Sequence, residues 1–275
     1  MSRIAVQPSC HVVSLRPVGA HQGMRRAAAR HGWRLLALSP WRLQPRDDAA
    51  SRAALSAALG CDCVIVTSPA AVAAADALQP LRQATTTWLA VGEGTRHALQ
   101  RHGVQAVLSP RRMDSEGLLD LPPLRPDAIG GHRVGMLTAP EGRGRLQSEL
   151  QSRGARLIQA DVYDRVPVRP SPQAVARLLR LPPPVWLALS SGQALQRILQ
   201  ALPNEARDHL LQARVVAASE RLGRHAVDAG FRGSVIVAAS ALPDALMAAI
   251  AAGCADTVCS AAPVRYGSDI TSETA

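Results

Sequence analysis

Two stretches of the chain decide its fold: VIVTSPAAV at residues 64–72 and VWLALSSGQAL at residues 185–195. Each reads as a short buried strand that ends on two hydroxyl residues and leads into a helix. The run Val64 to Val66 is β-branched, as is typical of a strand covered on both faces. Ser68 before Pro69 predicts a helix N-cap with proline at the first helical position. Because a helix start also presents N–H groups to anions, a structural cap and an anion site both remain open.

The two stretches belong to a repeat that runs through the chain. Residues 12–38 match residues 133–160, and residues 88–104 match residues 214–231. Each copy is a strand, a loop and a helix that is closed by a glycine, namely Gly32, Gly154, Gly103 and Gly230. The repeat predicts two similar α/β units, each a parallel sheet flanked by helices.

The two copies need not be contiguous domains. The segments 40–45 and 162–170 are polar, contain proline and lie between an expected strand and an expected helix. We interpret them as a two-strand linker, so that residues 1–40 and 168–255 form one domain, residues 46–161 form the other, and residues 256–275 form a loose tail. Ligands of parallel sheets bind beyond the carboxyl ends of the strands, which predicts an active-site cleft between the domains.

The charge of the chain is unusual. Its 275 residues include 31 basic side chains, all arginine, and the net charge is +10. Without lysine there is no Walker A loop and no Schiff-base lysine. Arginine favours anionic partners such as polycarboxylates or nucleic acid. Because the arginines are spread along the chain and aromatic residues make up 3%, we expect no nucleic-acid partner.

The sequence also bears on cofactors and compartment. No apolar run reaches the roughly 18 residues of a membrane span, and the first residues make a poor signal peptide. The five cysteines are scattered and read as reduced thiols, so we predict a cytoplasmic protein without membrane contact. The histidines lack metal-site spacing, and GEG at residues 92–94 lacks the third glycine of a dinucleotide loop. We therefore expect no metal and no nicotinamide cofactor.

The order of several motifs resembles the uroporphyrinogen-III synthase family from about Val12 to Ile250. These motifs are SLRP, VTSPAAV, AVGEGTRHALQRHG, the Gly142–Arg143 helix start, VYDRVP and LSSGQAL. The resemblance implies a cofactor-free cyclising lyase of tetrapyrrole and haem biosynthesis. Such an enzyme closes linear hydroxymethylbilane to uroporphyrinogen III, with inversion of ring D and loss of water. We expect a monomer, and a transient contact with the preceding pathway enzyme stays open.

The resemblance also suggests site residues. Tyr163 matches the tyrosine of the family's hinge motif and is our candidate for the proton donor, although it could simply pack the hinge. Candidates for binding the substrate carboxylates lie at strand-to-helix turns and are Arg16, Thr67, Ser68, Gly92, Thr95, Thr138, Arg143, Ser190, Ser191 and Ser219.

Three departures from the family pattern keep an alternative open. Leu15 precedes Arg16 where the family has threonine, and Thr138–Ala139 replaces its Arg-Gly pair. Ser219 and Leu222 stand in place of a glycine and a threonine. A non-catalytic module of the same fold that binds an anion or nucleic acid is therefore the alternative function.

Overall fold

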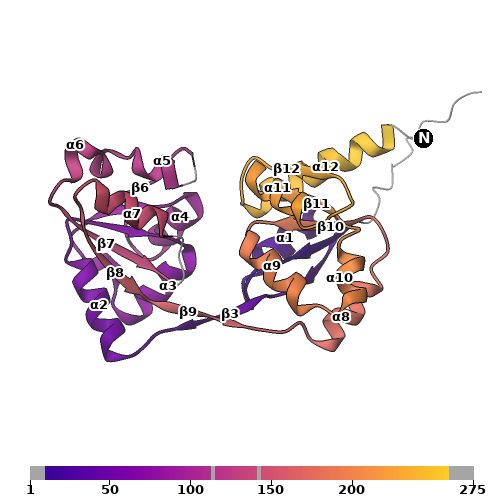
Figure 1. Ribbon diagram of the computed structural model, residues 1–275, viewed down its shortest axis with the longest axis horizontal. Helices are drawn as coiled ribbons and strands as arrows, with labels where there is room; N and C mark the ends of the chain where they lie inside the picture. Colours follow the sequence, from indigo (N-terminus) through magenta and orange to yellow (C-terminus); the bar gives the residue numbers. More distant parts are fainter. Residues whose placement is uncertain (1–9, 113–114, 141–143, 260–275) are drawn as a thin grey trace, which may run out of the picture. The chain divides into compact units, whose positions relative to one another are not determined.

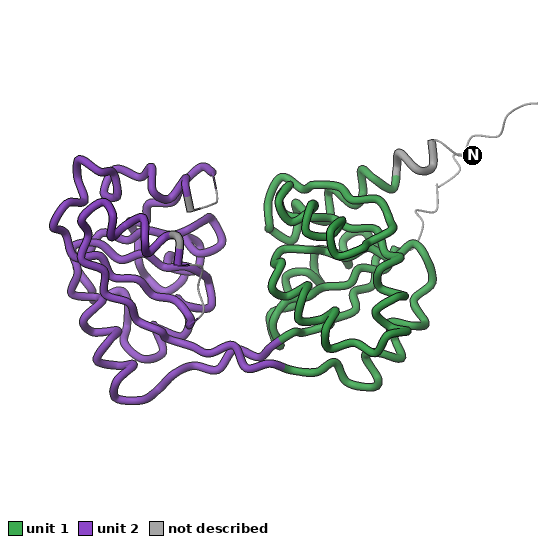
Figure 2. The backbone as a smooth tube through the Cα atoms, in the orientation of Figure 1, with its two compact units in different colours: residues 1–40, 168–275 green, residues 41–167 purple. Residues whose placement is uncertain are grey.

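The computed structural model describes residues 10–112, 115–140 and 144–259. It divides the chain into two compact units, which Figure 2 colours separately. Unit 1 holds residues 1–40 and 168–275, and unit 2 holds residues 41–167. Unit 2 therefore includes residues 41–45 and 162–167, which the sequence predicts as a linker outside both domains.

Unit 1 is built on a five-stranded parallel sheet (Figure 1). In spatial order its strands are β12 (Val235–Val237), β11 (Arg214–Ala217), β10 (Val185–Leu189), β1 (His11–Ser14) and β2 (Arg34–Ala37). Its helices are α1 (Gln22–Arg30), α8 (Pro172–Leu179), α9 (Gly192–Ala201), α10 (Asn204–Leu210), α11 (Glu220–Asp228) and α12 (Pro243–Cys259).

Alternation of side chains along the strands gives this sheet two buried faces. Val12 and Trp186 pack in one cluster with Met24 of α1 and Met247 of α12. Leu187, the residue after Trp186 in β10, is also fully buried, and by strand alternation it lies on the opposite face of the sheet. Helix α8 packs against β2, and α11 packs against β11 and β12. Unit 1 is thus a sheet between helical layers.

Unit 2 has the same construction. In spatial order its parallel strands are β6 (Val107–Leu108), β5 (Thr87–Ala90), β4 (Cys63–Val66), β7 (Arg133–Thr138) and β8 (Arg156–Asp161). Its helices are α2 (Ala49–Leu59), α3 (Pro69–Leu78), α4 (Glu93–Arg101), α5 (Ser115–Leu119), α6 (Pro126–Ile129) and α7 (Arg145–Ser152), with short 3₁₀ turns η1 (Leu81–Gln83) and η2 (Pro122–Leu124).

The two faces of the unit 2 sheet carry separate clusters. Val64 and Val66 pack with residues of α2, α3 and α4. Cys63 and Ile65 pack on the other face with residues of α5, α6 and α7. Gly135 in β7 lets α2 approach closely, because a Cβ there would lie 2.3 Å from the Ala58 carbonyl oxygen.

The strand orders confirm the repeat predicted from the sequence. If β7 and β8 are matched to β1 and β2, and β4–β6 to β10–β12, the two sheets have the same spatial order. The four closing glycines also adopt the positive φ expected just past a helix C-terminus. The predicted α/β class, with parallel sheets flanked by helices, is therefore confirmed.

Two further strands and the C-terminal helix complete the described chain. Strands β3 (Trp41–Pro45) and β9 (Tyr163–Pro167) pair antiparallel, with Trp41 opposite Pro167. The prediction of a loose tail from residue 256 is wrong for residues 256–259, because α12 continues to Cys259. The rest of that tail lies outside the described residues. The cleft predicted between the domains stays a prediction.

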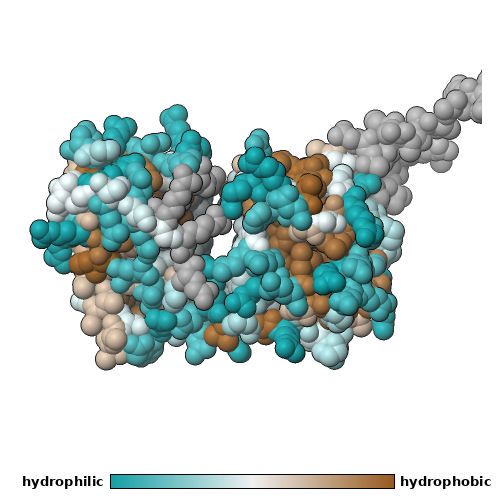
Figure 3. All heavy atoms as spheres, in the orientation of Figure 1, coloured by the Kyte–Doolittle hydropathy of each residue, from teal (hydrophilic) through white to brown (hydrophobic). Residues whose placement is uncertain are grey.

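Exposed apolar surface is found mainly on unit 1. Four large hydrophobic side chains stand out there among the described residues, namely Val18, Val227, Val237 and Leu242, whereas unit 2 exposes Leu108. In the view of Figure 3, hydrophobic atoms likewise cover more of unit 1 than of unit 2.

Candidate active site

The strand order of unit 2 reverses next to β4, which is where we expect its ligand-binding crevice. The chain runs outward from β4 through β5 to β6, then returns to place β7 on the other side of β4. In open parallel sheets such a reversal opens a ligand-binding crevice at the carboxyl ends of the two central strands. Those ends carry Thr67 and Ser68 after β4 and Thr138 at the end of β7. Three of the predicted site residues are therefore neighbours.

Thr67 and Thr138 tie the two central strands together. The Thr67 N–H donates to the Leu137 carbonyl oxygen at 3.1 Å. The Thr67 hydroxyl lies 3.0 Å from Thr138 Oγ1 and 3.2 Å from the same carbonyl oxygen. Thr138 is 8% exposed, so its hydroxyl is held inside the protein. These bonds hold the carboxyl ends of β4 and β7 together.

Ser68 has two roles at the start of α3. Its Oγ accepts the Ala71 N–H at 3.1 Å, which confirms the predicted N-cap. The same Oγ lies 3.2 Å from the hydroxyl of Tyr163. The Tyr163 side chain is 3% exposed, and its ring packs in the core cluster with Val66. The phenol is thus held in place with its hydroxyl beside the cap.

The start of α3 offers few backbone donors. Pro69 has no N–H, and the N–H groups of Ala71 and Val72 donate to Ser68. Ala70 supplies the remaining N–H of this helix start. An anion here would be bound by one backbone donor together with hydroxyl groups, rather than by the row of N–H groups expected from the sequence.

The turn at Gly92 is arranged differently. Gly92 precedes α4 and is buried, and Thr95 is 3% exposed. The Glu93 carboxylate lies in the first turn of the helix, where it accepts bonds from Arg96 and from the Ser109 hydroxyl. The bonds from Arg96 hold the pKa of Glu93 below its ordinary value. Since a carboxylate already occupies this helix start, the arrangement disfavours a substrate carboxylate there.

Unit 1 presents an equivalent edge at β1 and β10. Ser190 follows β10, and Ser191 caps α9 by accepting the Ala194 N–H at 3.2 Å. Arg16 follows β1 and donates from Nη2 to the Ala241 carbonyl oxygen at 3.0 Å. Burial lowers the pKa of the Arg16 guanidinium from its ordinary value.

Of the two remaining candidates, Ser219 lies among the described residues and Arg143 does not. Ser219 caps α11 by accepting the Leu222 N–H at 3.4 Å. Its hydroxyl therefore replaces the glycine of the first copy with a side-chain cap. Arg143 and Gly142 lie outside the described residues.

A buried histidine near Arg16 was missed by the sequence analysis. His21 is 6% exposed, with Nδ1 3.1 Å from Ser14 Oγ and Nε2 2.8 Å from Ser39 Oγ. Burial, followed by the charges of Arg25 and Arg16, lowers its pKa to about 4. His21 is therefore neutral at neutral pH and joins the carboxyl ends of β1 and β2. Its position after an expected strand end was the available signal.

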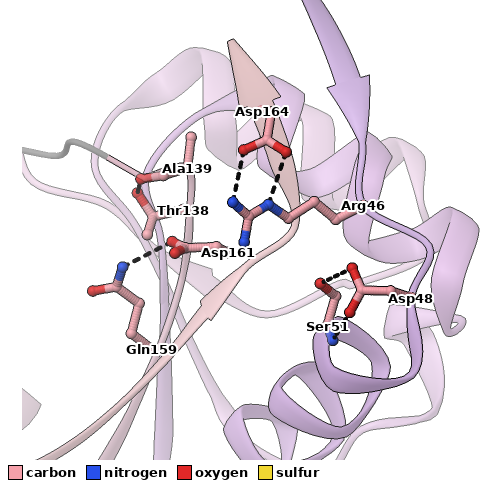
Figure 4. A network of polar contacts seen from close by, with 8 residues as sticks. All are labelled: Arg46, Asp48, Ser51, Thr138, Ala139, Gln159, Asp161 and Asp164. Carbon is pink, nitrogen blue, oxygen red and sulfur yellow. Dashed lines mark hydrogen bonds and ion pairs between the residues drawn. The ribbon is translucent and has the colours of Figure 1, made fainter. Parts of the chain in front are cut away.

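A second missed feature lies next to Tyr163. Arg46 donates from Nε to Asp164 Oδ2 at 2.9 Å and from Nη2 to Asp164 Oδ1 at 2.8 Å. Figure 4 shows this pair with Asp161, whose Oδ1 accepts from Gln159 Nε2 at 2.8 Å. Arg46 and Asp164 are far apart in the sequence, so no local pattern indicated the pair.

Comparison with known proteins decides the family. The family model described as uroporphyrinogen-III synthase HemD matches residues 22–248. The chain belongs to the uroporphyrinogen-III synthase family. The match covers Ser68, Tyr163 and most of both copies of the repeat, which confirms the resemblance inferred from the motifs.

Individual relatives agree with this assignment. The chain is 32% identical to the uroporphyrinogen-III synthases of Escherichia coli and Salmonella typhimurium over 165 residues. That alignment covers 59% of this chain and 66% of each relative, so the chain matches slightly less than two thirds of their length.

Solved structures agree in fold. A mutant uroporphyrinogen III synthase from Thermus thermophilus matches with a TM-score of 0.58 and 16% identity, over 90% of this chain and 100% of that one. The Helicobacter pylori uroporphyrinogen-III synthetase matches with a TM-score of 0.57 and 13% identity, over 88% and 98%.

The described residues offer neither a metal site nor a membrane-spanning helix. No three His, Cys, Asp or Glu side chains within residues 10–112, 115–140 and 144–259 are grouped so that they could hold a metal ion. No helix in the described part of the chain is long and apolar enough to cross a membrane.

Proposed function

We propose that this protein is a uroporphyrinogen-III synthase that converts hydroxymethylbilane to uroporphyrinogen III and water. The proposal is supported by the family match over residues 22–248. The observation that carries it is the 3.2 Å contact between the Tyr163 hydroxyl and Ser68 Oγ at the expected crevice of unit 2. The contact supports the proposal because both hydroxyls lie at the carboxyl end of β4, the region where parallel sheets bind ligands.

The reaction requires control of the orientation of the substrate and a proton for the departing hydroxyl group. Loss of the hydroxyl group from the bilane leaves an azafulvene, which a pyrrole carbon of the same molecule then attacks. The steps are redox-neutral, and the departing hydroxyl takes one proton to become water. Without an enzyme the unrearranged carbon reacts and the type-I isomer forms.

Inversion requires attack by the ring D carbon that already carries the bridge to ring C. That bridge bond then breaks and re-forms at the free ring D carbon, whose proton is released and balances the one taken by the hydroxyl. The protein must hold the chain so that the substituted carbon is reached, which is control by orientation.

Tyr163 is the proposed donor of that proton. The Ser68 hydroxyl already accepts the Ala71 N–H, so its own hydrogen can point to the phenol oxygen. In that arrangement the phenol hydrogen is directed to the substrate. When it leaves, Ser68 donates to the phenolate and stabilises the charge that develops. Ser68 is thus a cap that also supports the acid.

Binding of the substrate carboxylates is proposed for groups that remain available at the two carboxyl edges. In unit 2 the Thr67–Ser68 turn offers the Ala70 N–H, because the Thr67 donors are bonded to Leu137 and Thr138 and the Ser68 hydrogen is assigned to Tyr163. In unit 1 the available groups are Arg16 and the Ser190–Ser191 turn, with Ser219 as a further cap. We assign Gly92 and Thr95 to structure because the Glu93 carboxylate already occupies their helix start, and Thr138 because its hydroxyl is bonded to Thr67. The 31 arginines favour the approach of a polyanion.

The test is a coupled assay in which hydroxymethylbilane is generated in situ and the porphyrin isomers are separated after oxidation. Type-III product supports the proposal, and type-I product alone refutes it. Retention on DNA at about 0.15 M salt would instead support the binding-module alternative. A cytoplasmic monomer remains our prediction for its state in the cell, and sedimentation of the purified protein tests the monomer.

A further inference from the structure

Arg46 contacts both residues that flank Tyr163. Its N–H donates to the Val162 carbonyl oxygen at 3.0 Å. Its guanidinium donates to both carboxylate oxygens of Asp164, at 2.9 and 2.8 Å. One residue at the end of β3 therefore holds the chain on either side of the proposed proton donor.

The pairing of β3 with β9 leaves Tyr163 without a backbone bond to the opposite strand. In the antiparallel register Pro45 lies opposite Tyr163, and Gln44 lies opposite Asp164. Pairs that exchange backbone hydrogen bonds alternate with pairs that do not. Arg46 and Val162 continue this register and share one bond, because the Val162 N–H donates to Thr138 instead. The next pair, Pro45 and Tyr163, therefore falls at a position without backbone bonds. Proline, which has no N–H, is tolerated at such a position.

Besides the backbone bonds of this ladder, Arg46 makes a bidentate contact (the fork) with the carboxylate of Asp164. A guanidinium that meets both oxygens of a carboxylate fixes direction as well as distance. The bonds to Asp164, together with the charges of Asp161 and Asp48, raise the pKa of Arg46 above its ordinary value. The side chains of Arg46 and Asp164 are 33% and 42% exposed, so the pair is not a buried ion pair held for stability.

We propose that Arg46 is a positioning residue that, through Val162 and Asp164, sets the position of the Tyr163 hydroxyl against Ser68. The inference rests on the proposed function, in which that hydroxyl donates the proton. In this account Arg46 acts through Asp164, to which its Nε and Nη2 are bonded, and not on the substrate itself.

The first test reads out Tyr163 directly and does not depend on activity. The chain has two tyrosines, so Tyr266→Phe leaves Tyr163 as its one tyrosine. In that background the ring resonances of labelled tyrosine report on Tyr163. Arg46→Met keeps the backbone bond to Val162 and removes the fork, and Asp164→Asn weakens the fork from the other side. Both should shift or broaden the tyrosine signal in a folded protein.

Arg52→Met is the matched control. Arg52 lies on α2, forms an ion pair with Asp47 and donates to the Leu78 carbonyl oxygen at 3.1 Å. Arg52→Met removes a surface ion pair similar to that of Arg46 and changes no contact of β9. The tyrosine signal should therefore not change. If Arg46→Met leaves the signal like that of Arg52→Met, the inference is wrong, whatever the activity of the protein.

The second test is kinetic. Arg46→Met and Asp164→Asn should each lower kcat roughly tenfold with little change in KM, below the hundredfold expected for a misplacement of ~1 Å. The double variant should be no worse than either single variant. In the Tyr163→Phe background neither should lower kcat further. Arg46→Lys, which keeps the charge but loses the fork, should recover part of kcat.

The opposite kinetic result identifies another role. If Arg46→Met raises KM while Asp164→Asn leaves it unchanged or lowers it, Arg46 binds a substrate carboxylate and the inference fails. If the wild-type protein makes no type-III product, the proposed function fails, and the tyrosine signal still decides whether Arg46 positions Tyr163.

Discussion

Replacing Ser68 with alanine removes two interactions made by one oxygen. The cap bond from the Ala71 N–H stabilises α3, and the contact with the Tyr163 hydroxyl supports the proposed acid. The first loss affects the folded state, whereas the second affects the transition state. A comparison of stability with kcat therefore separates them.

The two magnitudes follow from the contacts. Loss of a serine cap costs ~1 kcal/mol of stability. A hydrogen bond to a charged group, here the developing phenolate, contributes about 1.5–3 kcal/mol, which corresponds to a fall in kcat of roughly 10- to 100-fold. Removal of a general acid costs about 10²- to 10⁴-fold, and Tyr163→Phe should lie near the lower end because a phenol is a weaker acid than the histidine and carboxylic acid groups that usually fill this role.

The assay is a double-mutant cycle with a matched cap control. Ser68→Ala should lower kcat in the wild-type background and leave it unchanged in the Tyr163→Phe background, while the loss of thermal stability is the same in both. Ser171 also precedes a proline and caps α8 by accepting the Ala174 N–H at 3.2 Å. Ser171→Ala should lose similar stability and keep kcat. If the losses from Ser68→Ala and Tyr163→Phe multiply, or if Ser68→Ala behaves like Ser171→Ala, the assigned role of Ser68 is wrong.

Three further predictions concern single contacts. Thr67→Val keeps the shape of the residue but removes its hydroxyl bonds between β4 and β7, so the free energy of unfolding should fall by ~1 kcal/mol in urea titrations. An unchanged free energy of unfolding would show that these bonds do not stabilise the fold. The pKa of His21 falls from 6.5 to about 4 on folding, so the unfolded state binds the proton more readily; stability should fall as the pH drops from 6.5 towards 4, and less steeply in His21→Asn, in the same titrations at several pH values. The thiols of Cys10 and Cys254 lie 3.4 Å apart, so diamide should oxidise them to a disulfide that peptide mass mapping detects and that Cys254→Ser abolishes; no such crosslink would contradict the contact.

Local patterns were enough to predict the elements of the fold. The Ser68–Pro69 cap, the closing glycines and the repeated strand-to-helix turns are each set by residues within a few positions of one another. The strand order then follows from the repeat, because equivalent strands occupy equivalent places in the two sheets.

The contacts of the site depend on pairing between distant segments. Ser68 meets Tyr163 only because β9 returns to the carboxyl end of β4. The partnership of Arg46 with Asp164 depends in the same way on the register of β3 and β9. The sequence also gave no sign that Thr95 is buried and that Glu93 occupies its helix start, since both facts depend on how α4 packs.

The central claim is that the protein directs ring closure to the inverted isomer. The most direct measurement fixes the rate at which hydroxymethylbilane is supplied, adds increasing amounts of this protein, and determines the isomer composition of the oxidised product. The account predicts that total porphyrin stays constant while the type-III share rises with protein concentration until it dominates. A product that remains type I at every concentration of folded protein would contradict it.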